Sequence, residues 1–293
     1  MTSPSLATPR LPSAVRPIVA EGLRAAQDAG MVLTRRFRTT LTVRSKGPQD
    51  IVTEADIEAQ AAIVKRLSRR FPDHGILAEE GLDTAPGAEW RWILDPLDGT
   101  KNFSRGIPTF CVSIAVERDG RIEAGIVHDP LLRETFLAVR GQGAWLNGES
   151  IQVSRVNRLG AAFLASGVPH RVREFSDVIA TTFGKFASRA LCLRCRGAGA
   201  LDLCYVACGR FDAYWELDQS PWDVAAGSLI VTEAGGRLSN FRGAPFDIFE
   251  GETVASNGRL HRQMLEVIGL SKATGRPSPR PNDSALQRRR RRR

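Results

Sequence analysis

The residues with the most evident chemistry are two aspartates, Asp95 and Asp98, in the segment Trp92-Ile-Leu-Asp-Pro-Leu-Asp-Gly-Thr100. The apolar run before them predicts a buried strand, whose rigid end would present both carboxylates on a tight turn. These carboxylates and the main-chain carbonyl of Leu97 are the hard oxygen ligands that Mg²⁺ prefers. Gly99 allows backbone amides to approach a phosphate group closely. The segment therefore predicts a magnesium and phosphate site, although an Asp-rich turn without a ligand is an alternative.

Acidic residues in three other segments are candidates for the same site. They occur in Asp50-Ile-Val-Thr53-Glu-Ala-Asp56, in Leu77-Ala-Glu79-Glu80 and in Trp222-Asp223-Val-Ala-Ala-Gly227. Several carboxylates brought together repel one another unless cations lie between them, so their clustering would itself indicate bound metal. Asp56 follows Thr53 by three residues at the expected start of a helix, where a capping box is an alternative or an additional role.

Together, these motifs resemble the inositol monophosphatase family over residues 13–270. The segments that contain Asp95 and Asp223 are similar to its two signatures, and the other two segments match further motifs in the expected order. Ala78 stands where the family usually has Gly. The resemblance implies a five-layer αβαβα sandwich, an α/β (α+β) fold of the inositol monophosphatase and fructose-1,6-bisphosphatase type. Two shorter matches are Gly141-Gln-Gly-Ala144 and Thr232-Glu-Ala-Gly-Gly236.

The resemblance also implies roles for single residues. Two or three Mg²⁺ ions would be held by Glu79, Asp95, the carbonyl of Leu97, Asp98 and Asp223, with Asp95 bridging two ions. The attacking water would be oriented by a catalytic set of Glu79, Thr100 and Asp56, in which Asp56 supports Thr100 through a hydrogen bond. The substrate pocket would comprise Glu79, Leu97, Asp98, Gly99, Thr100, Gly197, Ala198, Gly199, Glu216 and Asp223. Within it, backbone amides of Gly99 and Thr100 would contact the phosphate, and Glu216 would bind a hydroxyl of the alcohol.

The implied activity is hydrolysis of a phosphate monoester by Mg²⁺-activated water, with myo-inositol monophosphate as substrate and Li⁺ as inhibitor. The expected partners are a small phosphorylated polyol and a second copy of the chain, in a homodimer. Alternative substrates in the wider superfamily are histidinol phosphate, fructose 1,6-bisphosphate and 3′-phosphoadenosine nucleotides. Tyr214-Trp-Glu-Leu217 most resembles the inositol phosphatase version, whereas Trp215 and Ala198 replace residues that are more usual in the family.

Other patterns that bear chemistry are weaker. Gly197-x-Gly199 lies between a strand-like and a helical run, as in a dinucleotide-binding loop, but Asp202 occupies the place of the third glycine. The start of that helix would still favour an anion. An odd count of five cysteines without a signal peptide predicts reduced thiols. Cys192-x-x-Cys195 with Cys204 and Cys208 leaves zinc binding as the alternative to small buried side chains.

Apolar periodicity predicts the elements that must position these residues. Helices are expected over residues 14–37, 53–71, 174–188, 200–208, 222–233 and 258–270. Strands are expected over 75–78, 90–94, 109–118, 121–128, 134–139, 161–166, 190–196, 211–217 and 253–256, with a hairpin over 143–153 around Asn147-Gly148. Residues 44–50 are expected to form a polar loop. Alternating helices and strands favour a layered sandwich.

The net charge of +9 comes mostly from residues 271–293. They hold nine basic residues, including the run Arg288–Arg293, and one acidic residue, Asp283, so their net charge is +8 and the other 270 residues carry +1. A nearly neutral body gives no support for nucleic-acid binding outside this tail. We expect residues 1–12 and 271–293 to be disordered tails around a single catalytic domain at 13–270. A nucleic-acid-binding regulatory role through the Arg-rich tail is the alternative function.

The composition is that of a soluble globular protein, with 42% hydrophobic and 25% charged residues. No apolar run approaches the length of about 20 residues that a membrane-spanning helix needs, so no membrane partner is expected. The N-terminal residues lack the apolar stretch of a secretory signal, which predicts a cytoplasmic protein.

Overall fold

The computed structural model describes residues 11–269. Its helices are α1 (Arg16–Arg36), α2 (Glu54–Arg70), α3 (Thr100–Ser104), α4 (Val172–Ala187), α5 (Gly199–Ala207), α6 (Pro221–Glu233) and α7 (His261–Gly269), with one 3-10 turn, η1 (Leu159–Ala161).

The larger sheet has eight strands. They are β3 (Gly75–Ala78), β4 (Leu82–Thr84), β5 (Trp90–Asp98), β6 (Cys111–Arg118), β7 (Arg121–Asp129), β8 (Glu134–Val139), β9 (Gly143–Leu146) and β10 (Glu149–Ser150). Their spatial order is β10-β9-β8-β7-β6-β5-β3-β4. Neighbours are antiparallel except for β3 and β5, which are parallel.

The smaller sheet has five strands. They are β11 (Phe163–Ser166), β12 (Cys192–Arg194), β13 (Ala213–Leu217), β14 (Arg237–Ser239) and β15 (Glu252–Ser256), in the order β12-β11-β13-β15-β14. β11 is parallel to both of its neighbours, and β15 is antiparallel to both of its own. A separate antiparallel hairpin is formed by β1 (Val43–Gly47) and β2 (Asp50–Thr53).

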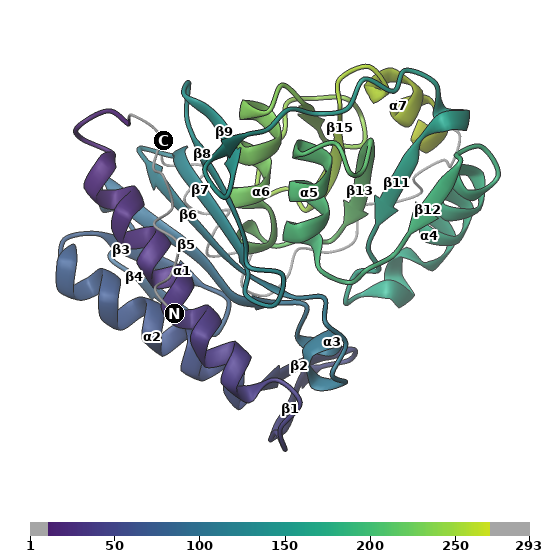
Figure 1. Cartoon of the computed structure of the whole chain (residues 1–293). Helices are drawn as coiled ribbons and strands as arrows, with labels where there is room; N and C mark the ends of the chain where they lie inside the picture. The colour runs from purple at the N-terminus through teal and green to yellow at the C-terminus, as the bar shows by residue number, and fades with distance from the viewer. Residues whose placement is uncertain (1–10, 270–293) are drawn as a thin grey trace.

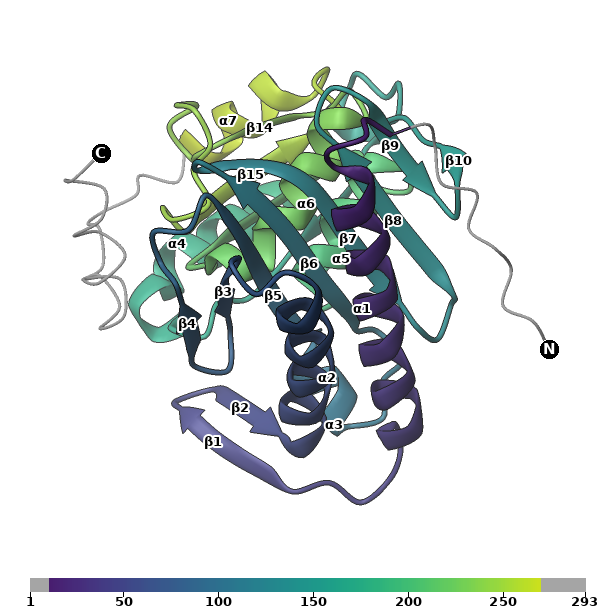
Figure 2. The ribbon, with the colours of Figure 1, turned by 90° about the vertical axis from the view of Figure 1, so that its left-hand side faces the viewer.

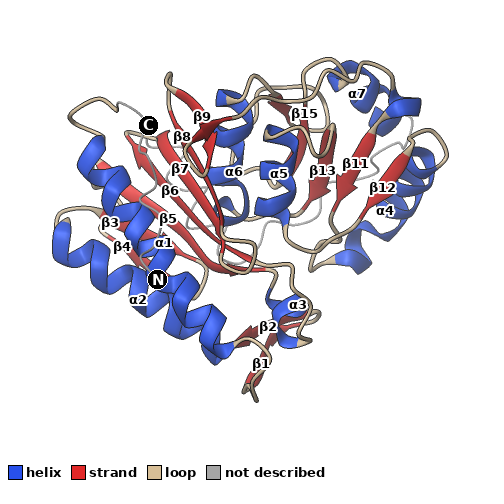
Figure 3. Cartoon of the chain, in the orientation of Figure 1, coloured by secondary structure: helices blue, strands red, loops and turns tan. Residues whose placement is uncertain are grey.

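The elements stack as five layers (Figure 1). α1 and α2 cover the outer face of the eight-stranded sheet, and α5 and α6 lie between the two sheets. α4 and α7 cover the far face of the five-stranded sheet. The alternation of helical and strand layers is also visible in Figure 3 and confirms the predicted αβαβα sandwich.

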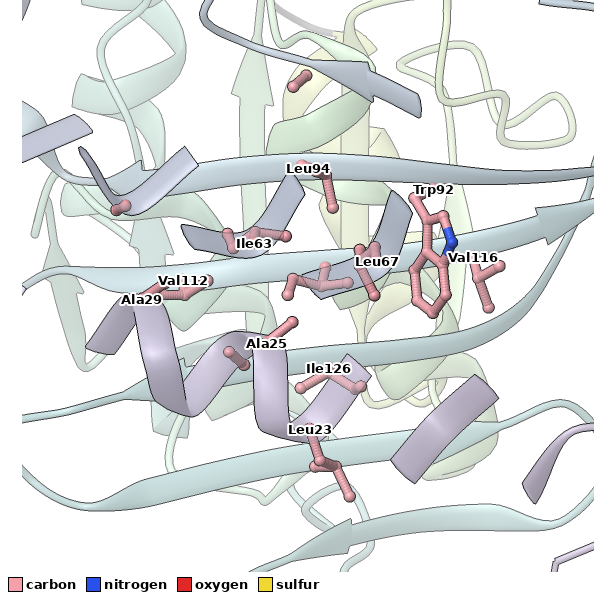
Figure 4. Packing of buried hydrophobic residues seen from close by; sticks show 14 of the residues in the cluster. Leu23, Ala25, Ala29, Ile63, Leu67, Trp92, Leu94, Val112, Val116 and Ile126 are labelled. Carbon is pink, nitrogen blue, oxygen red and sulfur yellow. The ribbon is translucent and has the colours of Figure 1, made fainter. Parts of the chain in front are cut away.

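The outer helices are held by apolar stripes that meet the larger sheet. Figure 2 shows α1 and α2 side by side across this sheet, with the β1–β2 hairpin at one end. Burying each large apolar side chain contributes about 1.5–3 kcal/mol, so this packing fixes the helices firmly. The interface joins Leu23, Ala25, Ala29, Ile63 and Leu67 of the helices to Trp92, Leu94, Val112, Val116 and Ile126 of the strands (Figure 4).

Helix α6 is buried on nearly all sides because it lies in the middle layer. Its backbone approaches β7 so closely that a Cβ at Gly125 would lie 2.6 Å from the carbonyl oxygen of Ala226. Only glycine permits this contact, and any larger residue would push the helix away from the sheet. The contact therefore fixes the position of α6, whose first turn carries Asp223.

Most predicted elements are present within a few residues of their expected bounds, and the differences have physical reasons. Residues 44–50 belong to the β1–β2 hairpin rather than a loop; its first strand is largely exposed, so no burial pattern marks it. β5 continues beyond Leu94 to Asp98, and the short elements β4, α3 and β14 were not predicted. Leu11 is only 2% exposed, which corrects the predicted disorder at that position. Residues 1–10 and 270–293, with the predicted tails, lie outside the described residues.

Within residues 11–269, no helix combines the length and the apolar character that crossing a bilayer demands. All five cysteines are free thiols.

Candidate active site

The turn at the end of β5 carries the two aspartates of the first motif. Asp95 is 2% exposed, and its Oδ1 atom accepts a hydrogen bond from the Leu97 amide at 2.9 Å. The pairing of β5 with β6 is irregular between Asp95 and Asp98, so the chain leaves the regular ladder there. Gly99 follows with a φ of +96°, and a Cβ at this position would lie 2.8 Å from the carbonyl oxygen of Thr109. Glycine is therefore required for α3 to begin directly after the aspartates.

The fold brings carboxylates from three distant segments into electrostatic contact. Burial raises the pKa of Asp95 well above its ordinary value. Three other carboxylates raise this pKa further, those of Glu79, Asp98 and Asp223. Burial also raises the pKa of Asp98, although the Ala200 amide offsets part of the effect by donating to its Oδ2 atom at 2.8 Å. The site therefore holds a concentration of negative charge that water alone does not relieve.

Asp223 is held at the start of α6. The Ser220 amide donates to its Oδ2 atom at 2.7 Å, as in a helix capping arrangement. The N-terminus of a helix favours negative charge, so the first turn of α6 stabilises this carboxylate close to the others.

Lys46 of β1 reaches the second acidic motif. Its Nζ atom lies 2.7 Å from Glu79 Oε1 and 2.9 Å from Glu80 Oε1, and all three side chains are mostly buried. Burial lowers the pKa of Lys46, but the two carboxylates outweigh this effect and the net shift is upward. Burial and the adjacent Glu79 charge raise the pKa of Glu80 to about 7. The hairpin thus supplies a cation that partly neutralises the acidic cluster.

Asp56 joins the start of α2 to Thr100. Its Oδ2 atom accepts from the Thr53 amide at 2.8 Å and the Thr53 hydroxyl at 2.6 Å, which caps the helix. Its Oδ1 atom accepts from the Thr100 hydroxyl at 2.9 Å. The expected hydrogen bond between Asp56 and Thr100 is therefore present together with the capping box, while the catalytic role of the pair stays a prediction.

Glu216 lies at the end of β13 with Tyr214 beside it. The Tyr214 hydroxyl donates to the Glu216 carboxylate, and the Gln219 side-chain amide donates to the Tyr214 oxygen at 2.9 Å. Burial raises the pKa of Glu216 to about 8, and the Asp223 carboxylate adds to the increase. Glu216 therefore faces the same group of acidic residues, consistent with a place beside a bound substrate.

Hydrogen bonds on both sides of residues 197–199 tie this segment to α3 and to Asp98. Asn102 of α3 donates to the Arg196 carbonyl at 2.7 Å, and the bond from the Ala200 amide to Asp98 secures the other side. Gly197 is exposed and Gly199 partly so. Ala198 is only 1% exposed, so it supports the segment from beneath and offers little surface to a substrate.

The donor set suits a hard divalent cation. No three Asp, Glu, His or Cys side chains between residues 11 and 269 are already arranged as a metal-ligand group. The carboxylates are held instead by the protein donors described above for Glu79, Asp98 and Asp223. Even so, burial and the neighbouring carboxylates both disfavour the ionised form of Asp95, and a divalent cation would relieve both effects. The residues present therefore fit Mg²⁺, and the individual ligand assignments stay predictions.

Three residues that shape the site were not predicted. Tyr214 precedes Glu216 by two positions in a strand, and this spacing places both side chains on one face, so the sequence contained a signal. Lys46 and Asn102 act on residues 33 and 94 positions away. No local pattern marks such contacts.

Comparisons with known proteins agree with this geometry. The model of the inositol monophosphatase family matches residues 15–271. The Nus factor SuhB of Pseudomonas aeruginosa is 40% identical over 261 residues, which cover 87% of this chain and 96% of that protein. The SuhB structure from Bartonella henselae superposes with a TM-score of 0.84 at 36% identity, covering 88% of this chain and 100% of the other. An inositol monophosphatase from Thermotoga maritima gives a TM-score of 0.82 at 35% identity, covering 87% and 98%.

Proposed function

This chain belongs to the inositol monophosphatase family of phosphatases, and we propose that it is a Mg²⁺-dependent phosphomonoesterase acting on a small polyol phosphate. The observation that carries the proposal is the convergence of distant acidic residues on Asp95, whose pKa is raised first by burial and then by the carboxylates of Glu79, Asp98 and Asp223. The proposed metal ligands are Glu79, Asp95, the carbonyl of Leu97, Asp98 and Asp223.

The residues of the chain would orient the reactants. The proton of the Thr100 hydroxyl is directed to Asp56 and the Leu97 carbonyl, at 2.9 and 3.0 Å, so its oxygen remains an acceptor for an attacking water. The turn at Gly99 presents backbone amides suited to phosphate oxygens. When bound, Mg²⁺ would neutralise phosphoryl charge, activate water and stabilise the leaving alkoxide.

The alcohol part of the substrate would lie against Glu216. Its carboxyl group offers hydrogen-bonding oxygens to the hydroxyls of a ring, and the buried Tyr214 hydroxyl orients that carboxyl group. A site built to bind hydroxyls rejects analogues that lack them, because its buried polar groups then lose their partners. We therefore propose myo-inositol monophosphate as the first substrate to test.

The test is phosphate release by the full-length protein from four substrates: myo-inositol 1-phosphate, histidinol phosphate, fructose 1,6-bisphosphate and 3′-phosphoadenosine 5′-phosphate. Release should require Mg²⁺, stop in EDTA and be inhibited by Li⁺, with the inositol ester fastest. Faster release from another of the four would change the proposed substrate, while the assignment as a phosphatase would still hold. No release from any of them at saturating Mg²⁺ would contradict the phosphatase itself.

A homodimer is the proposed assembly, on the strength of the family resemblance. The chain has a mass of 32.0 kDa, so sedimentation equilibrium should report about twice this value.

The name of the relatives supports a second candidate function. Proteins called Nus factor SuhB match most of this chain, and residues 271–293 carry a net charge of +8. We propose as the alternative that the chain acts as such a factor by binding RNA through its tail. Replacing Arg288–Arg293 with glutamines should abolish binding of a labelled single-stranded RNA and leave phosphate release unchanged. Unchanged RNA binding would rule out the tail as the binding element.

A further inference from the structure

A cavity lies away from the candidate active site, between the eight-stranded sheet and the far half of α6. We call it the basic cavity; its volume is about 1020 Å³. It is lined by the start of β5, the β6–β7 turn, the second half of α6, β14 and the loop 246–249. Pockets for small ligands have volumes of about 300–1000 Å³, so this one is large enough for an organic molecule.

The cavity has an apolar side. Ile122 and Leu229 are buried in its wall, and three half-buried residues of the loop add to it: Phe246, Ile248 and Phe249. Contact with such surfaces removes apolar ligand area from water and contributes about 25 cal/mol per Å².

The lining holds four arginines, Arg91, Arg121, Arg140 and Arg237, and two carboxylates, Glu117 and Asp247. Arg91 is compensated, since it lies 3.7 Å from Glu117 and 3.4 Å from Asp83. Arg121 and Arg237 are exposed, and neither side chain forms an ion pair or hydrogen bond with another residue in the described range 11–269.

Arg140 adds a third exposed guanidinium. It donates to the Ile122 carbonyl at 2.7 Å and lies 3.8 Å from Glu123. The lining therefore has cations in excess beside an apolar wall, and guanidinium groups bind carboxylate, sulfonate and phosphate oxygens through paired N–H groups.

We propose that the basic cavity binds a small amphipathic anion, with its acidic group on Arg121 and Arg237 and its apolar body against α6 and the loop 246–249. With four arginines against two carboxylates, the lining favours an anionic ligand over a cationic one. The cavity is distinct from the active site: Arg91 precedes Asp95 by four strand residues, about 13 Å, and Thr232 follows Asp223 by nine helical residues, about 14 Å.

The experiment uses 8-anilinonaphthalene-1-sulfonate, an aromatic sulfonate whose fluorescence increases in apolar sites, titrated into the full-length protein. Its neutral counterpart N-phenyl-1-naphthylamine reports the apolar contribution alone. The sulfonate should bind at least about 5-fold more tightly than the neutral probe, and should raise the melting temperature because it binds the folded state.

Arg121→Glu and Arg237→Glu should each weaken sulfonate binding about 5-fold or more, since each reverses a charge at the cavity. Arg158→Glu is the matched control, an exposed arginine outside the lining, and should change affinity less than about 2-fold. Circular dichroism and melting temperature establish that the variants fold.

Three results would overturn the proposal. Equal effects of the cavity and control variants would place the probe elsewhere, including on the C-terminal tail. A melting temperature lowered by the sulfonate would mean binding to unfolded chain. Conversion of the protein to a smaller species by Arg237→Glu, seen by sedimentation, would show that the cavity is covered by a second copy of the chain.

Discussion

β5 and α6 each run between two regions of opposite charge. At one end, β5 presents Asp95 and Asp98 and α6 presents Asp223. At the other end, the same two elements line the basic cavity, where exposed arginines predominate. One pair of rigid elements thus supports a region rich in carboxylates at one end and a region rich in arginines at the other.

The two regions also differ in how deeply their charges are buried. The carboxylates lie in or near the interior and raise one another's pKa values, whereas the arginines surround an open cavity. Buried, interacting charges respond strongly to pH and substitution, and exposed arginines remain charged throughout the physiological range.

Asp95→Asn removes one charge from the acidic region with little change in shape. Phosphate release should fall about 10³-fold, equivalent to about 4 kcal/mol of transition-state stabilisation. The metal-free protein should become more stable to urea, because its pKa shift shows that the ionised carboxylate is disfavoured. Arg121→Gln in the basic cavity is the control and should change the rate less than about 2-fold. A similar loss in both variants would remove the functional distinction between the regions.

Thr100→Val removes the hydroxyl that Asp56 orients and leaves the side-chain volume nearly unchanged. We expect kcat to fall about 10²-fold, as is typical when a group that positions a proton is lost. Thr100→Ser retains the hydroxyl and should recover most of the rate. If Val and Ser variants were equally slow, the methyl group and not the hydroxyl would be the important feature.

Raising the pH should destabilise the metal-free protein. The folded-state pKa values of Glu216 and Glu80, about 8 and about 7, exceed the ordinary value of 4.5, so the folded state binds more protons than the unfolded chain between these limits. From these two groups, the free energy of unfolding in EDTA should therefore fall by about 6 kcal/mol between pH 5 and pH 8. Urea titrations at each pH measure this free energy of unfolding.

Glu216→Gln should remove much of this pH dependence of the free energy of unfolding. The arginines of the basic cavity should contribute nothing to it, because they stay charged. Saturating Mg²⁺ should flatten the profile. A wild-type profile that is already flat in EDTA would show that the acidic region tolerates its charge without a cation.

Lys46→Met should produce the smallest effect. A cation that binds Glu79 must replace the ammonium group that lies 2.7 Å from it, so removal of Lys46 should lower the Kd for Mg²⁺ about 3-fold. Isothermal titration calorimetry gives the Kd directly. Arg44→Met on the same strand is the control. A weaker Mg²⁺ affinity in the Lys46 variant would mean that the ammonium helps to organise the site.

Local patterns were sufficient to predict most of the fold. The spacing of Thr53 and Asp56 marked the start of α2, and apolar periodicity marked the strands of the larger sheet. The β1–β2 hairpin was missed because its exposed residues show no alternation of buried and exposed positions. β5 was predicted to stop at Leu94, since Pro96 and the charged residues after it resemble the end of a strand.

The candidate site could be predicted only in part from the sequence. The family motifs indicated which acidic residues belong together, but their mutual effect on the pKa of Asp95 depends on folding. Lys46 contacts Glu79 across 33 residues of sequence. The basic cavity is likewise lined by segments that are distant in sequence. The periodicity of a single sequence does not reveal contacts between residues that are far apart in the chain.

Asp56 links the start of α2 to Thr100, the residue that we propose orients the attacking water. One carboxylate oxygen secures the opening turn of α2, and the other positions Thr100. Loosening of that turn would release the Thr100 hydroxyl while both sheets stay intact, because local openings require less free energy than global unfolding. On heating, activity should therefore disappear before the bulk of the protein melts.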